Sequence, residues 1–226
     1  MMMDGKDPVV RVALDVQLKQ IKQDLLRLGT LVIQAMDRSM QALQENDKIL
    51  AERIVHDDQF LNEVRFGVEE LCLELIATQQ PAAGDLRSIV AAMTIVGDLE
   101  RMGDHAAGIA KTVLRMEKPL EIKSDSELLQ MAVRVRTMLQ RGMEAYENED
   151  PHLAYRVATM DDAIDSHYQA LFREYLALMA ANPESAAAIL YLLFSGHNLE
   201  RIGDRVTNIA ERVIFMTSGE LEELNV

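Results

Sequence analysis

The chain has 226 residues, of which 49% are hydrophobic and only 4% aromatic, so it can bury a continuous core in one large domain or two small ones. Its 37 acidic residues outnumber its 23 basic ones, for a formal net charge of -14. An acidic surface repels nucleic acid and anionic lipid, and no apolar stretch approaches the roughly 20 residues of a membrane span. We therefore expect no nucleic-acid partner, no membrane insertion and, because residues 1–6 lack a signal-peptide core, a cytoplasmic protein.

Three long helices are predicted in the first half of the chain. Apolar side chains recur at steps of three and four residues within 14–32, 61–75 and 99–113, which is the spacing of one helix face. The pair Asn46-Asp47 is expected to cap the second helix, and Pro81 is expected in the turn that leads to the third. The single cysteine, Cys72, lies in an apolar run and is expected to be buried.

Three more helices are predicted in the second half, where apolar stripes of the same spacing cover 128–138, 164–178 and 199–213. Their boundaries are indicated by Pro and by capping residues, namely Lys118-Pro119, a capping box Ser124-x-x-Glu127, Asp150-Pro151 and Asn182-Pro183. Long helices with such stripes pack into bundles, so the predicted class is all-α.

The chain also matches itself. The segment Asp98-Leu-Glu-Arg-Met-Gly-Asp104 aligns with Asn198-Leu-Glu-Arg-Ile-Gly-Asp204 at an offset of 100. On the preceding helices, Asp58 and Asn62 align with Asp161 and Asp165 at an offset of 103. We interpret this as two tandem three-helix bundles, over 8–118 and 119–226, whose six long helices are related by an internal repeat.

Each repeat carries two carboxylates four residues apart on one helix face, Glu100 with Asp104 and Glu200 with Asp204. Like charges at this spacing repel by roughly 0.2–0.5 kcal/mol. The glycine inside each motif, Gly103 or Gly203, costs about 1 kcal/mol relative to alanine. A bound cation would offset the repulsion, and a glycine would permit close approach by a neighbouring backbone or a ligand.

Residues equidistant from the turn of an antiparallel helix pair lie level with each other. Asp58 and Asn62 are therefore predicted level with Asp104 and Glu100 across Pro81, and Asp161 and Asp165 level with Asp204 and Glu200 across Asn182-Pro183. Such oxygen-rich sets suit hard metal ions. The alternative is salt bridging, in which the carboxylates are neutralised by Arg101, Arg201 and Arg205.

The doubled motif resembles the paired E(D)xxxD signatures of the PhoU family, and the resemblance extends from about residue 12 to residue 217. It implies two similar three-helix bundles, often as a homodimer, with divalent or trivalent metal ions (iron, Mg, Mn, Zn or Ca) at the motifs. Carried over residue by residue, it implies metal-binding roles for Glu100, Asp104, Glu200, Asp204, Asp58, Asp161, Asp165, Asp98 and Asn198. Asn62 departs from the acidic pattern and argues against equal loading of the two halves.

The resemblance further implies a non-catalytic regulator of phosphate uptake, peripheral to the membrane, that represses the phosphate regulon when phosphate is abundant. Its implied partners are the ATPase subunit of the phosphate ABC transporter and a phosphate-sensing histidine kinase. No nucleophile–base set, P-loop or zinc spacing indicates an enzyme. Three alternatives stay open: a di-metal enzyme, a metal-storage protein, and a PhoU relative serving another transporter or a stress response. The first would need two E-x-x-H motifs, and only Glu149-x-x-His152 matches that spacing.

Overall fold

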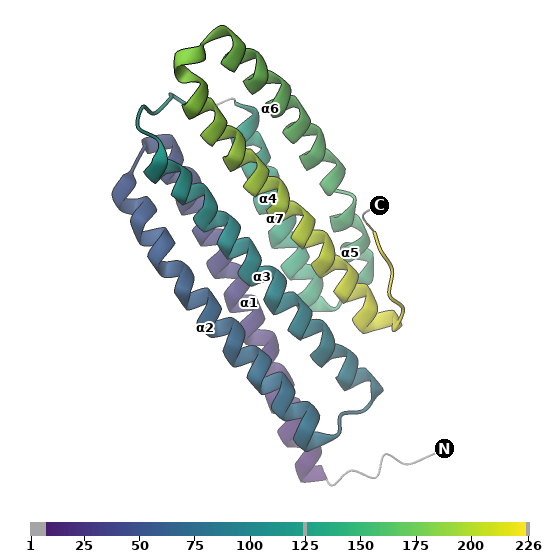
Figure 1. Cartoon of the computed structure of the whole chain (residues 1–226). Helices are drawn as coiled ribbons and strands as arrows, with labels where there is room; N and C mark the ends of the chain where they lie inside the picture. The colour runs from purple at the N-terminus through teal and green to yellow at the C-terminus, as the bar shows by residue number, and fades with distance from the viewer. Residues whose placement is uncertain (1–7, 124–125, 225–226) are drawn as a thin grey trace.

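The computed structural model describes residues 8–123 and 126–224, and its regular elements there are all helical. Its long helices lie side by side in an elongated bundle (Figure 1). In chain order they are α1 (Pro8–Glu45), α2 (Lys48–Gln79), α3 (Ala83–Arg115), α4 (Glu127–Asn148), α5 (Pro151–Ala158), α6 (Asp161–Ala181), the short 3-10 helix η1 (Pro183–Ser185) and α7 (Ala186–Ser218). The predicted all-α fold of two repeats is confirmed. None of the described helices combines the length and apolar content that a membrane span requires.

The two repeats meet through their last helices. Helix α3 packs against α1, α2 and α7, and α7 packs against α3, α4, α5 and α6. The two central helices run antiparallel (Figure 1). Their apolar stripes are buried, with Leu99, Ile109, Leu199 and Ile209 all inaccessible to solvent, and Cys72 is buried as predicted. Burial of each such aliphatic side chain stabilises the fold by about 1.5–3 kcal/mol.

Most predicted helix boundaries are confirmed. Asp47 caps α2 by accepting a hydrogen bond from the Leu50 amide at 2.9 Å, and Asp150 caps α5 through the amides of His152 and Leu153. The predicted capping box is wrong. Its Ser124 lies outside the described residues, and the N-cap of α4 is Ser126, whose side chain makes no capping bond. The helix therefore begins two residues later than a box on Glu127 requires.

The helix expected across 151–181 is divided at Thr159 and Met160 into α5 and α6. Met160 donates its amide to the carbonyl of Val157, a three-residue step that tightens the turn and interrupts the regular helix. No Gly or Pro signals this break in the sequence. It places Asp161 in the first turn of α6, where the helix dipole favours negative charge.

Candidate metal centre

The predicted register of the first hairpin is confirmed at its centre. Asp58 of α2 lies beside Asp104 of α3, the residue predicted to lie level with it. Burial and the neighbouring Asp104 carboxylate raise the pKa of Asp58 to about 6, whereas the positive charge of Lys111 opposes the shift. Glu100 lies one turn earlier on α3 and is only 7% exposed.

The motif glycines let the neighbouring helix approach closely. A Cβ at Gly103 would overlap Leu61 of α2 and lie 3.4 Å from the Asp58 Oδ1. A Cβ at Gly203 would lie 3.1 Å from the Asp161 Oδ1 of α6. Each glycine therefore admits the helix that delivers the first aspartate of its cluster, which explains why the motif includes a poor helix former.

The second hairpin gathers more carboxylates than the first. Asp161, Asp165 and Asp204 each offer an oxygen, and these oxygens lie within 4.8 Å of one another. Among the described residues, the equivalent side chains of the first repeat form no such group. Burial and the adjacent Asp204 charge raise the pKa of Asp165 as well. Two of the three helical positions belong to α6 and one to α7, so the group joins the two arms of the hairpin.

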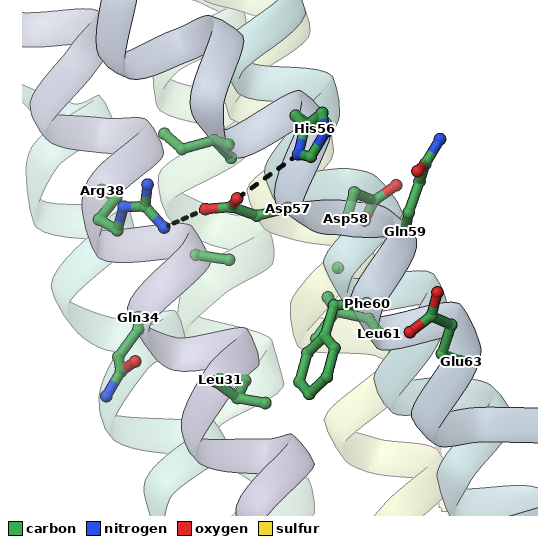
Figure 2. Close-up of a pocket in the computed structure, with 13 residues that line it drawn as sticks. Leu31, Gln34, Arg38, His56, Asp57, Asp58, Gln59, Phe60, Leu61 and Glu63 are labelled. Carbon is green, nitrogen blue, oxygen red and sulfur yellow. Dashed lines mark hydrogen bonds and ion pairs between the residues drawn. The ribbon is translucent and has the colours of Figure 1, made fainter. Parts of the chain in front are cut away.

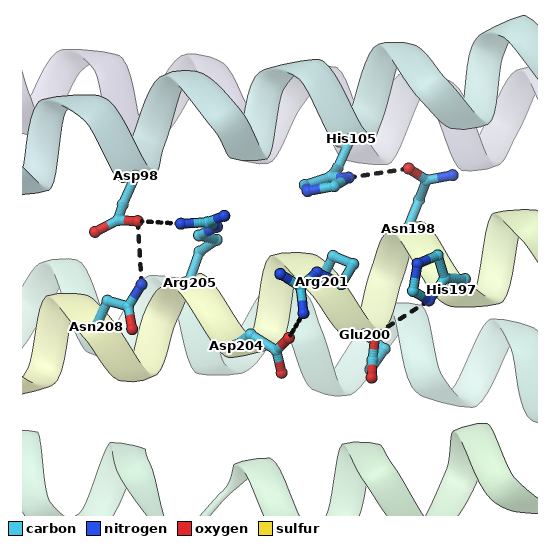
Figure 3. A network of polar contacts seen from close by, with 9 residues as sticks. All are labelled: Asp98, His105, His197, Asn198, Glu200, Arg201, Asp204, Arg205 and Asn208. Carbon is cyan, nitrogen blue, oxygen red and sulfur yellow. Dashed lines mark hydrogen bonds and ion pairs between the residues drawn. The ribbon is translucent and has the colours of Figure 1, made fainter. Parts of the chain in front are cut away.

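Glu200 borders this group. Burial, followed by the charge of Asp204, raises the pKa of Glu200 to about 7, and Arg201 opposes the shift. Its Oε2 lies 3.3 Å from the His197 Nδ1, on the side of α7 that faces away from α3 (Figure 3). The salt-bridging alternative is confirmed in one respect, because Arg201 donates to the Asp204 Oδ2 at 2.7 Å.

Asp98 and Asn198 lie elsewhere. Both are between α3 and α7, whereas Glu200 and Asp204 lie on the opposite side of α7 (Figure 3). Asp98 accepts hydrogen bonds from Arg205 at 3.0 Å and from Asn208 at 3.1 Å. The Asn198 Oδ1 lies 3.0 Å from the Nδ1 of His105, whose pKa is lowered by burial. The structure thus separates these two predicted ligands from the carboxylate clusters and assigns them to the contact between the repeats.

One residue of the first cluster was missed by sequence reasoning. Arg65 of α2 donates to Glu69 at 2.8 Å, and its Nη1 lies 3.3 Å from the Glu100 Oε1. It lies seven residues after Asp58, on the same helix face, so its spacing was a usable signal. The repeat-equivalent residue in α6 is Tyr168, whose pKa is raised by burial and by Glu200.

A cavity of about 400 Å³ opens between α1 and α2 next to the first cluster (Figure 2). Asp58 and Gly103 line it, together with the half-exposed ring of Phe60. At its other edge, Arg38 of α1 donates to Asp57 of α2 at 2.9 Å. Asp58 therefore borders both the hairpin and an opening to solvent.

The two donor sets differ in what they can hold. Three aspartate oxygens that converge from two helices, with Glu200 next to them, match the all-oxygen coordination that hard cations prefer. In the first repeat, only two carboxylates, Asp58 and Asp104, lie together, and the third, Glu100, is paired with Arg65. The second cluster fits a cation and the first fits it poorly.

The PhoU domain, as a sequence family, matches this chain twice, over residues 25–113 and 128–213. A phosphate-specific transport system accessory protein PhoU homolog of Streptococcus pneumoniae is 36% identical over 217 residues, which cover 96% of this chain and all of that protein. The protein of the same description from Clostridium acetobutylicum is 34% identical over 218 residues, with the same coverage of both chains.

Solved structures agree with this match. The crystal structure of the phosphate transport system regulatory protein PhoU from Streptococcus pneumoniae superposes with a TM-score of 0.86 at 34% identity, over 92% of this chain and 99% of that one. PhoU from Pseudomonas aeruginosa superposes with a TM-score of 0.86 at 31% identity, over 91% of this chain and 99% of that one.

Proposed function

The chain belongs to the PhoU family, and we propose that it is a non-catalytic regulator of phosphate uptake that represses the phosphate regulon when phosphate is abundant. The observation that carries this proposal is the match of both repeats, over nearly the whole chain, to relatives described as phosphate transport accessory proteins. The role requires a surface that partners can recognise rather than a reaction centre. We place it in the cytoplasm, as a homodimer at the inner side of the transporter.

The proposed partners are the ATPase subunit of the phosphate transporter and the phosphate-sensing histidine kinase. An exposed apolar patch on the second hairpin supports docking of the ATPase subunit. We call it the α6–α7 patch; its side chains are between 41% and 49% exposed, and they are Phe172, Leu176, Leu190 and Phe194. The hairpin register places Phe172 level with Phe194 and Leu176 level with Leu190. Exposed apolar groups of this kind are typical of protein interfaces.

The surroundings of the α6–α7 patch indicate the chemistry of its partner. The carboxylate cluster begins about two helical turns away, because Asp165 precedes Phe172 by seven residues on α6, with Tyr168 between them. The chain as a whole carries a net charge of -14. A partner surface with apolar side chains edged by lysine or arginine would complement both features.

We further propose that Asp161, Asp165 and Asp204, with Glu200 alongside, hold a hard cation in the second repeat. Such an ion would supply positive charge where like charges converge, and it would tie α6 to α7. The Asp161 carboxylate is nearly inaccessible, at 2% exposure, and it is the member best placed to fix the position of an ion. The arrangement would stiffen the hairpin that bears the α6–α7 patch.

A di-metal enzyme is the weaker proposal. Its sequence signal was Glu149-x-x-His152, and Glu149 lies on the surface in an ion pair with Lys22 at 2.8 Å, at the C-terminus of α4. That position lies outside α6 and α7, the two helices that carry the Asp161 cluster. The remaining alternative, a PhoU relative that serves another transporter, makes a different prediction about partners.

Recovery of partners from cells distinguishes these proposals. The full chain, carrying an affinity tag, would be isolated from phosphate-replete cells of the source organism, and the ATPase subunit of the phosphate transporter would be sought by quantitative mass spectrometry. Enrichment of that subunit over an untagged strain is the expected result. Enrichment of a different transporter's ATPase subunit instead would assign the protein to the alternative.

A further inference from the structure

The two repeats carry different charges at equivalent positions around their carboxylates. At three such positions the first repeat has the more positive residue: Asn62 against Asp165, Arg65 against Tyr168, and Lys111 against Glu211. The glutamate and aspartate of the E-x-x-x-D motif are the same in both repeats. The differences therefore concern one added carboxylate, Asp165, and the positive charges that neutralise each cluster.

In the first repeat, the guanidinium of Arg65 already occupies the position of a counter-ion. It donates to Glu69 at 2.8 Å and lies 3.3 Å from the buried carboxylate of Glu100. Guanidinium groups stay protonated at all physiological pH values, so this charge is permanent. Lys111 adds a second positive charge near Asp58. This charge acts to lower the pKa of Asp58, although burial and the Asp104 carboxylate outweigh it and the pKa is raised overall.

In the second repeat, no arginine occupies the equivalent position. Tyr168 takes the place of Arg65. Its ring packs in a tilted arrangement against the His197 ring, with 6.0 Å between the ring centroids. Asp165 adds the carboxylate that Asn62 lacks, and it completes the group with Asp161 and Asp204. Arg201 pairs with Asp204, and its side chain is 40% exposed, so it can turn outward to make room for an ion.

We propose that the two repeats have divided their roles: a hard cation binds at the second cluster, and the first cluster is closed to metal because Arg65 serves as its permanent internal counter-ion. This inference rests on the cation site proposed above. It assigns Arg65 a specificity role that the repeat alignment alone does not reveal. It also makes the second hairpin, which bears the α6–α7 patch, the metal-dependent half of the molecule.

Metal content of the purified full chain tests the proposal. Protein stripped with chelator would be equilibrated separately with Mn²⁺, Zn²⁺ and Fe²⁺, desalted and analysed by elemental mass spectrometry, with electron paramagnetic resonance for Mn²⁺. Asp165→Asn, which gives the second cluster the amide of the first, should reduce the retained metal to background. Asp58→Asn with Asp104→Asn should leave the metal content of the wild type unchanged.

A gain-of-binding variant tests the role of Arg65 directly. Asn62→Asp with Arg65→Tyr gives the first cluster the equivalents of Asp165 and Tyr168, and it should double the metal retained by the wild type. Circular dichroism would confirm that each variant is folded before its metal is counted. Three results would each overturn the proposal. They are a halved metal content in the variant with Asp58→Asn and Asp104→Asn, no additional metal in the variant with Asn62→Asp and Arg65→Tyr, and no metal retained by the wild type.

The same experiment separates this inference from the proposed function. Metal is counted on purified protein, whereas partner recovery and regulation are measured in cells. A chain that enriches the transporter's ATPase subunit but retains equal metal in both repeats keeps its function and loses the division of roles.

Discussion

Asp98 of α3 and Arg205 of α7 form an ion pair with 3.0 Å between Oδ1 and Nη1, and this pair joins the two repeats. The repeat equivalents of these residues are Asn198 and His105, which lie 3.0 Å apart. The two contacts are therefore the same pairing on either side of a local twofold axis between α3 and α7. One is ionic with a buried carboxylate and the other is an amide–imidazole contact, so we expect the first to contribute more to the association of the repeats.

Removal of the Asp98 carboxylate should destabilise the whole chain. Asp98→Ala leaves the Arg205 charge and the Asn208 amide without their acceptor in a largely buried interface, so we expect the free energy of unfolding to fall by about 2–3 kcal/mol. Urea denaturation monitored by circular dichroism measures this change. Asp37→Ala is the control, because it breaks an exposed pair with Arg136 and should cost less than about 1 kcal/mol. Equal losses of unfolding free energy in the two variants would contradict a stabilising role for the Asp98 carboxylate between the repeats.

The motif glycine Gly103 should resist replacement by alanine. Alanine favours helix by about 1 kcal/mol, yet a Cβ here overlaps the buried side chain of Leu61, and such overpacking costs typically about 1–3 kcal/mol. We therefore expect Gly103→Ala to lower the melting temperature. A Cβ at Gly97 of the same helix would have open space around it, with no neighbouring atom of the described residues within 4 Å, so Gly97→Ala should raise it. If thermal denaturation gave a higher melting temperature for both variants, the close packing of α2 against α3 would not depend on a glycine at position 103.

The stability of metal-free protein should depend on pH through Glu200. Its pKa rises from 4.5 to about 7 on folding, so between these values the folded chain binds more protons than the unfolded chain. This contribution to the free energy of unfolding is fully present below pH 4.5 and is lost as pH rises towards 7. Glu200→Gln should flatten that decline in urea titrations at several pH values, whereas the exposed control Glu147→Gln should reproduce the wild-type slope.

The α6–α7 patch should be required for regulation but not for folding. Phe172→Ser with Phe194→Ser replaces exposed rings, so we expect little change in the free energy of unfolding and a loss of ATPase-subunit recovery from cells. The matched control is Leu73→Ser with Val90→Ser, which replaces exposed apolar side chains on the equivalent hairpin of the first repeat. Equal loss of the partner in both variants would show that the second hairpin has no special role.

Sequence reasoning predicted well what a single hairpin determines. Asp58 lies level with Asp104 because the two residues are equally far from Pro81 in the turn and both helices rise by the same amount per residue. The convergence of Asp161 and Asp204 follows in the same way. Caps at Asp47 and Asp150 were read from local chemistry alone and are confirmed.

What depends on the packing of one repeat against the other was not predictable in this way. No hairpin register places Asp98 opposite Arg205, since α3 and α7 are joined through α4, α5, α6 and η1. Asp98 and Asn198 were therefore grouped with the motif next to them in sequence. The break at Thr159 was missed because neither it nor Met160 is a helix breaker. Arg65, by contrast, was within reach of helical spacing arguments.

Alkaline phosphatase activity in phosphate-rich medium reports whether this protein represses the phosphate regulon. It would be measured in the source organism, in a strain deleted for this gene, and in that strain complemented with the full chain. We expect that activity rises in the deletion strain and returns to the wild-type level on complementation. Activity that stays at the wild-type level in the deletion strain would contradict a role in repressing the phosphate regulon.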